Sequence, residues 1–187
     1  RSVLFGAKNI ESLRQGACVV QMSTIAPDDA AAISQEVAAI RPDLHFIDAP
    51  VSGGVVGAEA GELTIMAAGV QDVLSKCRQA FEVLSKVVFE AGERPGQGAA
   101  MKAVNQLLCG VHIAAAAEAL ALAEKSGIDA STMLTLLQGS SASSWMLKDR
   151  GPRMIAEPND ITSAINIFCK DMGIVCDSAK TSKAFTP

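Results

Sequence analysis

The chain has 187 residues, 49% of them hydrophobic, and this is enough apolar material to bury a core and to exclude a disordered protein. The formal net charge is −4, and the Lys and Arg residues are scattered along the sequence. Because nucleic acid and anionic membrane surfaces require a concentrated basic face, we expect neither of them as a partner.

The five cysteines predict reduced thiols and an intracellular, cytoplasmic protein. They form no C-x-x-C pair, and an odd number does not suit a disulfide framework. Only His45 and His112 are present, so no zinc or other metal site is expected. No apolar run reaches the ~20 residues that a membrane span needs. Because residue 1 is Arg rather than Met, an upstream segment, including an organelle-targeting leader, can precede it.

Up to about Gly92 the chain alternates short apolar runs with helical segments. The pattern predicts helices from about Pro27 to Ile40 and from about Gln71 to Leu84, and strands at 17–22, 44–49, 63–68 and 86–91. Such βαβ alternation is typical of a parallel sheet covered by helices.

From Gln97 onward the strand signal disappears. Residues 97–127 predict one helix of roughly 30 residues that ends at Gly127, and further helical stretches follow at about 130–138, 143–155 and 160–180. We therefore predict an α/β fold in two parts: the back half of a Rossmann-type parallel sheet at residues 1–95, and an all-helical domain built on the long helix at residues 96–187.

The junction contains the sequence GQGAAM (96–101), which follows a strand and opens a helix, as a dinucleotide-binding G-x-G-x-x-G does. Its third glycine is replaced by Met101, and no acidic residue ends a following strand ~20 residues later. We interpret it as a flexible hinge and helix N-terminus rather than as a phosphate-binding loop.

Two groups of residues are candidates for a site. The stretch DAPVSGGVVGAEAG (48–61) contains glycines that predict a sharp bend or a close approach of the backbone to another group. Lys102 and Asn105, three residues apart, share a face of the long helix. Lys102 is the only cation between residues 97 and 117, which places it at the edge of a cleft. For the pair Lys170 and Asp171, a site role and a surface role both remain open.

These motifs together carry a resemblance. DAPVSGG followed by A-x-x-G-x-L-T-I-M, then G-Q-G-x-x-x-K-x-x-N, then a late KDM, resembles the β-hydroxyacid dehydrogenase family, which includes 3-hydroxyisobutyrate dehydrogenase, over nearly the whole chain. Residues 140–155 are most similar to the sugar-acid branch, the L-threonate dehydrogenases. The resemblance implies a Rossmann domain that binds NAD or NADP, a helical domain like the C-terminal domain of 6-phosphogluconate dehydrogenase, and a homo-oligomer formed through the helical domain.

The resemblance also implies roles for single residues. Lys102 matches the catalytic lysine, which takes the hydroxyl proton of a 3-hydroxyacid while hydride moves to the nicotinamide. The small hydroxycarboxylate substrate is bound by Asn105 and by the turn Ser52, Gly53 and Gly54. Thr24 and Lys170 match residues that contact the cofactor.

The sequence departs from the family in several places. The second asparagine of the family is Gln106 here, and Met172 replaces a leucine. The N-terminal glycine fingerprint and the final helices are missing, so we expect a fragment or a truncated product that binds NAD(P) weakly and can be inactive.

Two alternative functions remain open. The first is a non-catalytic binding or regulatory module, which would suit a chain without the adenosine-binding strands. The second is an aldolase-type enzyme in which Lys102 forms a Schiff base. The sequence leaves open which 3-hydroxyacid is the substrate and whether the cofactor is NAD or NADP.

Overall fold

The computed structural model describes residues 1–156 and 164–184. The chain divides into two compact units, one made of Arg1–Val104 with Gly173–Pro187 and the other of Asn105–Met172. The helix α5 (Gln97–Lys125) begins in the first unit and continues into the second. The predicted domain boundary after residue 95 therefore stays a prediction.

The first unit contains a five-stranded sheet. Its strands are β1 (Cys18–Gln21), β2 (His45–Asp48), β3 (Val51–Ser52), β4 (Leu63–Ala68) and β5 (Ser85–Gly92). The order is β1-β2-β4-β3, with β5 also paired to β4. The pairs β1–β2 and β4–β5 are parallel, as the βαβ pattern predicted, whereas β2–β4 and β3–β4 are antiparallel.

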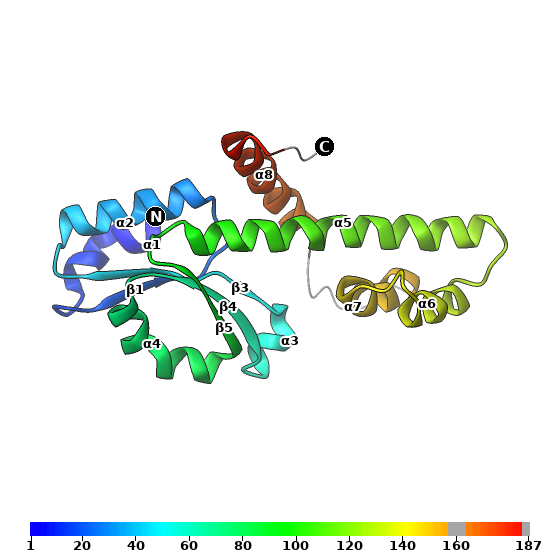
Figure 1. Ribbon diagram of the computed structural model, residues 1–187, viewed down its shortest axis with the longest axis horizontal. Helices are drawn as coiled ribbons and strands as arrows, with labels where there is room; N and C mark the ends of the chain where they lie inside the picture. The colour runs from blue at the N-terminus through cyan, green and yellow to red at the C-terminus, as the bar shows by residue number, and fades with distance from the viewer. Residues whose placement is uncertain (157–163, 185–187) are drawn as a thin grey trace. The chain divides into compact units, whose positions relative to one another are not determined.

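Helices cover both faces of the sheet (Figure 1), as predicted for an α/β fold. The helix α2 (Pro27–Ile40) lies on one face and α4 (Gln71–Leu84) on the other. The core under α4 is formed by Ile47, Ala49, Ile65, Ala67, Val73, Leu74 and Phe81. A second cluster, Ile10, Ile33, Val37 and Leu44, packs under α2. Both clusters keep the sheet buried, which suits strands with near-continuous apolar runs.

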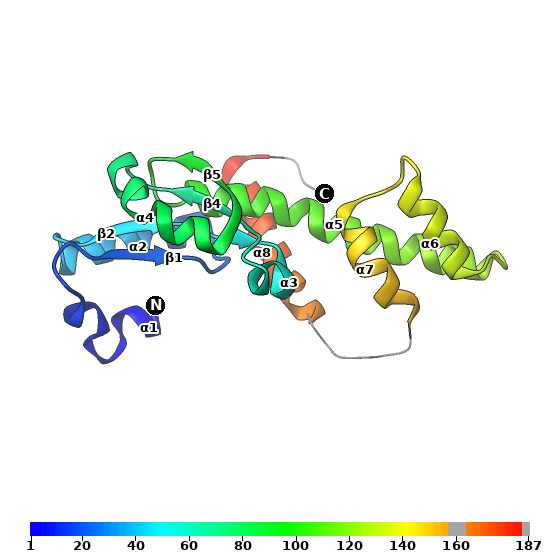
Figure 2. The same cartoon turned by 90° about the horizontal axis from the view of Figure 1, so that it is seen from below.

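The N-terminal segment adds α1 (Ser2–Phe5) and the 3-10 helix η1 (Gly6–Ser12), which the sequence pattern did not predict (Figure 2). Arg41 ties this segment to the end of α2. Its guanidinium donates to the carbonyls of Ile10, Glu11 and Leu13 at 3.1–3.2 Å. It also forms two hydrogen bonds of 2.7 Å to the carboxylate of Asp43. The Arg41 hydrogen bond is the main reason that the pKa of Asp43 falls to about 2.

The second unit is helical and contains α6 (Ala130–Gly139) and α7 (Trp145–Ile155). The helix α8 (Ile165–Ser182) begins in the second unit and, from Gly173, belongs to the first. All three lie close to the predicted stretches; residues 160–163 of the last stretch lie outside the described part of the chain. Side chains cap two of these helices, because Asp129 accepts from the N–H of Thr132 and Ser144 from that of Leu147. The core joins α5, α6 and α7 through Ala116, Leu120, Leu134, Leu137 and Leu147.

The helix α5 is long and apolar enough, by length and composition, to cross a membrane. The expectation that no run in the sequence reaches this limit was wrong, because the alanines of α5 raise its hydropathy while charged residues are few. One such helix is weak evidence for a span. One face of α5 is engaged in the protein core, where Ala116 and Leu120 pack against α6 and α7.

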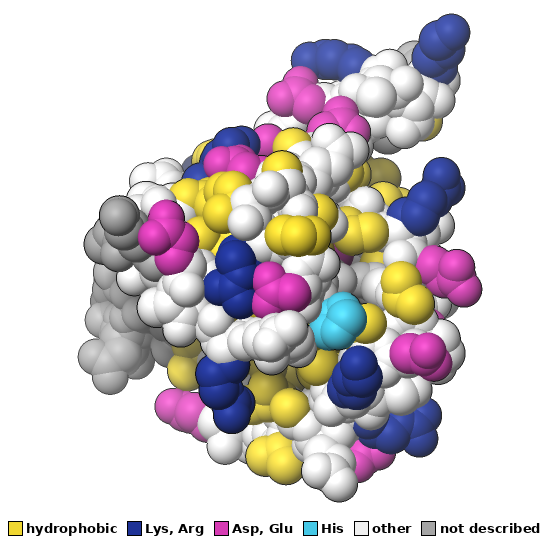
Figure 3. All heavy atoms as spheres, turned by 90° about the vertical axis from the view of Figure 1, so that its left-hand side faces the viewer, with side chains coloured by type: hydrophobic (Ala, Val, Ile, Leu, Met, Phe, Trp, Pro, Cys, Tyr) yellow, Lys and Arg dark blue, Asp and Glu magenta, His cyan; other side chains and the backbone are white. Residues whose placement is uncertain are grey.

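One face of the molecule is shown in Figure 3 with side chains coloured by type. Lys and Arg side chains alternate there with Asp and Glu, and no large patch of one sign forms among the described residues on this face. An electrostatic footprint for nucleic acid is therefore not seen on it.

The Arg41–Asp43 pair predicts a pH-dependent stability. Because the folded-state pKa of Asp43 is about 2, below the ordinary value of 3.8, its contribution is complete above pH 3.8 and is lost as the pH falls through about 2. Asp43→Asn should lower the free energy of unfolding at pH 6, and its difference from wild type should shrink steadily below pH 4. Urea unfolding followed by circular dichroism measures this.

Asp177→Asn is the control, because Asp177 forms an exposed ion pair with Lys180. It should leave the stability nearly unchanged throughout this pH range. A difference between Asp43→Asn and wild type that stays constant from pH 6 to pH 3 would contradict the prediction.

Candidate active site

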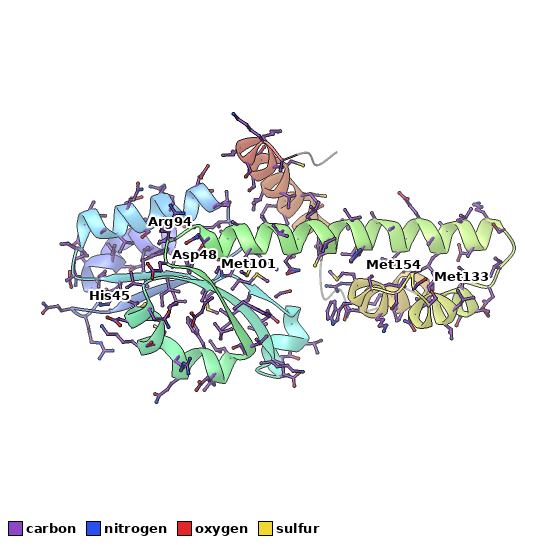
Figure 4. All side chains as sticks on the ribbon, in the orientation of Figure 1. His45, Asp48, Arg94, Met101, Met133 and Met154 are labelled. Atoms are coloured by element: carbon purple, nitrogen blue, oxygen red, sulfur yellow. The ribbon has the colours of Figure 1, made fainter. Side chains whose placement is uncertain are left out.

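The N-terminus of α5 is anchored on a buried carboxylate. Asp48, the last residue of β2, is fully buried, and Figure 4 shows it against the first turn of α5. Its Oδ2 accepts hydrogen bonds from the backbone N–H groups of Gly96 at 2.9 Å and Ala99 at 2.8 Å. The first N–H groups of a helix have no partner within the helix and carry a partial positive charge. Asp48 therefore caps α5 from another element.

Two glycines allow this close docking. A Cβ on Gly98 would lie 2.5 Å from the carbonyl oxygens of both Asp48 and Met66. Gly96 has φ +101°, and a Cβ there would lie 2.8 Å from the carbonyl oxygen of Pro27. The interpretation of this junction as a flexible hinge is corrected by these contacts, because both glycines are buried and packed against backbone.

The same contacts argue against GQGAAM as a phosphate loop. A phosphate at a helix N-terminus is held by free backbone N–H groups and by the helix dipole. Here the N–H groups of Gly96 and Ala99 already donate to the carboxylate of Asp48. An anion would therefore meet occupied donors and a carboxylate.

Asp48 is a fully buried carboxylate whose surroundings alter its pKa. Burial raises its pKa above the ordinary value, and the N–H groups of Ala99, Gly96 and Gly98 oppose this shift. Its second oxygen, Oδ1, is buried and has no hydrogen-bond partner among the described residues. Burial of this carboxylate therefore has a desolvation cost, which its hydrogen bonds to the first turn of α5 offset in part.

Lys102 lies on the face of α5 that this anchor buries. The buried positions Ala99, Lys102, Ala103 and Gln106 follow the spacing i, i+3, i+4, i+7 of one helix face. Lys102 is only 5% exposed, although lysine is among the residues least often buried. A buried amine in this place is a candidate for proton transfer.

The turn Ser52–Gly54 leaves the edge of the same sheet. Ser52 pairs with Thr64 of β4, and the helix α3 (Gly54–Glu59) begins directly after it. Gly53 has φ +134° and Gly54 has φ +63°, a backbone conformation that L side chains rarely adopt. A Cβ on Gly54 would meet nothing within 4 Å. The turn thus has a conformation that needs glycine and open space beside Gly54.

The second unit brings together two motifs that are far apart in the sequence. Gln106 of α5 donates from Nε2 to Oδ2 of Asp171 in α8 at 2.5 Å. Oδ1 of Asp171 lies 2.8 Å from the ammonium of Lys170, whose side chain is half exposed. A Cβ on Gly110 would lie 2.6 Å from Sδ of Met172, so α5 and α8 cross closely here. The Lys-Asp motif of α8 therefore adjoins Gln106 of α5.

The remaining predicted residues are placed as follows. Thr24 lies in the loop between β1 and α2, after the carboxyl end of β1. Asn105 donates from Nδ2 to Sγ of Cys109 at 3.3 Å, and its Oδ1 is buried without a hydrogen-bond partner among the described residues. Thr24, Ser52–Gly54 and Lys102 belong to the first unit, and Asn105 and Lys170 to the second.

Reasoning from the sequence missed Asp48 and did not assign a role to Gln106 or Asp171. A signal existed for Asp171, because an aspartate on an otherwise apolar helix must find a partner when it is buried. Asp48 was visible only as the first letter of the glycine-rich stretch, and its partners lie 48 and 51 residues later.

A pocket of about 260 Å³ lies between α4 and β5, and none of the predicted site residues lines it. Arg78, Glu82, Lys86 and Glu90 contribute charges of both signs to its wall. This mixture indicates no particular ligand.

The docking of α5 predicts that Gly98→Ala is destabilising. The two atoms that its Cβ would meet are backbone oxygens, which cannot move without shifting a strand, so we expect a loss of about 1–3 kcal/mol in the free energy of unfolding. Gly173→Ala in α8 is the matched control, because a Cβ there meets nothing within 4 Å. It should raise the stability by roughly 0.4–1 kcal/mol. Equal urea midpoints for the two variants would contradict the close docking.

Comparisons with known proteins agree with this architecture. Residues 1–92 match the family described as the NAD binding domain of 6-phosphogluconate dehydrogenase. Residues 96–187 match the family described as NAD-binding of NADP-dependent 3-hydroxyisobutyrate dehydrogenase.

Individual relatives extend the match over almost all of the chain. L-threonate dehydrogenase of Escherichia coli K12 is 40% identical over 96% of this chain, which spans 59% of the relative. The crystal structure of 3-hydroxyisobutyrate dehydrogenase from Salmonella typhimurium superposes with a TM-score of 0.92 at 35% identity, over 100% of this chain and 65% of that one.

A structure of Mycobacterium tuberculosis 3-hydroxyisobutyrate dehydrogenase with L-serine gives a TM-score of 0.74 at 29% identity, over 95% of this chain and 62% of that one. The chain thus spans about three fifths of the length of these relatives. The ordered motifs, the fold and the matches along both halves agree, and the chain belongs to the β-hydroxyacid dehydrogenase family.

Proposed function

We propose that this chain is part of an enzyme that oxidises a 3-hydroxyacid to the 3-oxo acid with NAD or NADP. The observation that carries the proposal is the burial of Lys102 on the face of α5 that is docked against the sheet. A buried amine on this face suits a proton-transfer role, because general acid–base catalysis requires a positioned group that exchanges a proton with the substrate.

The turn Ser52–Gly54 is proposed to bind the substrate carboxylate. Its glycines have positive φ angles, and the space beside Gly54 is open. Backbone N–H groups can approach an anion closely only where no Cβ intrudes. The hydroxyl of Ser52 offers a further donor to a carboxylate oxygen.

The chemistry then follows from the roles of two residues on α5. Lys102 accepts the proton of the substrate hydroxyl during oxidation and returns it during reduction. NAD or NADP, when bound, supplies the acceptor for the hydride, which leaves the substrate carbon that bears this hydroxyl. Asn105 hydrogen-bonds the substrate, and its buried Oδ1, which lacks a partner among the described residues, supports this role.

Thr24 and Lys170 are proposed to contact the cofactor on its nicotinamide side. A hydroxyl after the carboxyl end of a strand and a half-exposed ammonium are suitable donors for such a ligand. The first turn of α5 does not suit the pyrophosphate, because Asp48 occupies its N–H groups. Both matched families are described as NAD-binding, which supports the choice of cofactor.

For the substrate we propose a small hydroxycarboxylate, and sugar acids such as L-threonate are the first candidates. The support is the 40% identity to L-threonate dehydrogenase, and 3-hydroxyisobutyrate is the next candidate. We further propose an intracellular enzyme, in keeping with five cysteines that are all free thiols.

We propose that the helical unit forms the contacts of a homo-oligomer. Large apolar side chains are exposed on its helices, and they include Leu108, Val111 and Leu122 on α5, Leu136 on α6 and Trp145 on α7. Exposed apolar surface of this kind favours association.

The decisive test is Lys102→Met in the full natural polypeptide. Turnover of L-threonate or 3-hydroxyisobutyrate should fall by about 10²–10⁴, the usual contribution of general acid–base catalysis, while the Kd of NAD(P)H changes little. Formation of NAD(P)H followed by absorbance gives turnover, and nucleotide fluorescence gives the Kd.

Lys125→Met is the matched control, since Lys125 ends the same helix and is exposed. It should keep wild-type turnover. If borohydride with a ketone substrate labels Lys102 covalently, an aldolase-type Schiff base replaces the dehydrogenase proposal. If wild type turns over no hydroxyacid yet binds one, the chain acts as a binding module.

A further inference from the structure

One short segment joins the anchor of α5 to the proposed substrate turn. Asp48 ends β2, and Ser52 follows only four residues later. Asp48 and Ala49 are fully buried, and Pro50 is among the most buried side chains. The N–H of Ala49 donates to β1 at 2.8 Å, and the carbonyl of Pro50 accepts from β4 at 2.9 Å. The segment is therefore held on both sides and cannot shift without breaking the sheet.

The helix that carries Lys102 is tied to this segment through its first turn. Asp48 accepts from the N–H groups of Gly96 and Ala99, and Lys102 follows Ala99 by three residues. Residues three apart lie on the same side of a helix, and helical side chains lean toward the N-terminal turn. Any displacement of the first turn therefore displaces the lysine with it.

A cap for stability alone would not need this arrangement. A Ser, Thr, Asn or Asp at the N-cap position, in place of Gly96, would accept from the N–H of the second or third helical residue from within the helix. The chain instead has Gly96 directly before α5 and takes the cap from β2, at the cost of burying a carboxylate. The arrangement fixes where the helix lies on the sheet, which a local cap cannot do.

We propose that Asp48 is a positioning residue, which sets the distance between Lys102 and the substrate turn Ser52–Gly54 by holding the first turn of α5. This inference rests on the proposed function of Lys102 and extends it to a residue that touches neither substrate nor cofactor.

Substitutions that change the length of the side chain at position 48 test the inference in the full natural polypeptide. Asp48→Glu keeps the charge but pushes the first turn of α5 outward by about one methylene. Misplacing a catalytic group by about 1 Å can cost as much as 10²-fold in rate. We therefore expect kcat to fall at least tenfold, with KM and the Kd of NAD(P)H within about twofold of wild type.

Asp48→Asn keeps the length of the side chain and one acceptor oxygen for the same two N–H groups. Its kcat should fall less than that of Asp48→Glu, because position rather than charge is required. If Asp48→Glu does not fold, Asp48→Ser takes its place, since a shorter side chain moves the turn in the opposite direction. Asp43→Asn controls for lost stability and should keep wild-type kcat, because Asp43 contacts Arg41 far from α5 in the sequence.

A double-mutant cycle shows whether Asp48 acts through Lys102. In the Lys102→Met background, Asp48→Glu should cause no further loss of kcat, because the group that it positions is already absent. Wild-type kcat for both Asp48→Glu and Asp48→Ser, a larger loss for Asp48→Asn than for Asp48→Glu, or a full additional loss in the Lys102→Met background would each overturn the inference.

The single variant Lys102→Met separates this failure from that of the proposed function. If Lys102→Met alone keeps wild-type turnover, the catalytic role of Lys102 fails and the positioning inference falls with it. If Lys102→Met is inactive and the cycle is additive, the proposed function stands and only the inference about Asp48 is overturned.

Discussion

The first unit depends on one interaction, the contact between the carboxylate of Asp48 and the first turn of α5. A buried carboxylate is costly unless hydrogen bonds compensate it, and here two helix N–H groups do so. Conversely, the N-terminus of a helix needs acceptors, and Gly96, which directly precedes α5, has no side chain to supply one. The carboxylate thus supplies acceptors for the helix N–H groups, and these N–H groups compensate the burial of the carboxylate. Their hydrogen bonds join the sheet to the helix that carries Lys102.

The second unit uses the same principle with different residues. Asp171 is buried in α8 and is compensated by the amide of Gln106 and the ammonium of Lys170. Removing one partner of a buried charged group strongly destabilises a protein. The contact between Gln106 and Asp171 therefore fixes how α5 and α8 cross. Gly110 allows the close approach, since a larger residue would collide with Met172. In both units, therefore, a buried acid holds a segment that carries one of the proposed site lysines.

Membership of the β-hydroxyacid dehydrogenase family gives these contacts their context. The motifs that carry the resemblance also make these contacts: DAPVSGG contains Asp48 and the turn Ser52–Gly54, GQG opens α5, and KDM contains Asp171. The fold matches solved relatives over the full length of the chain, although the chain spans only about three fifths of those relatives.

The sequence by itself determined the α/β class, four of the five strands, the long helix and the family, because periodic apolar runs and ordered motifs are local signals. It did not predict β3 or α3, since two and six residues are too short to show a period. The antiparallel pairs of β4 also depend on that unexpected turn.

Only the tertiary structure decided what the glycines of GQGAAM approach. Their partner, Asp48, lies 48 residues before Gly96, and Asp171 lies 65 residues after Gln106. Helix caps are read from neighbouring residues, and a cap from another element leaves no pattern beside the helix. Local chemistry therefore indicated which residues could act, whereas long-range packing determined which of them are buried, paired and held in place.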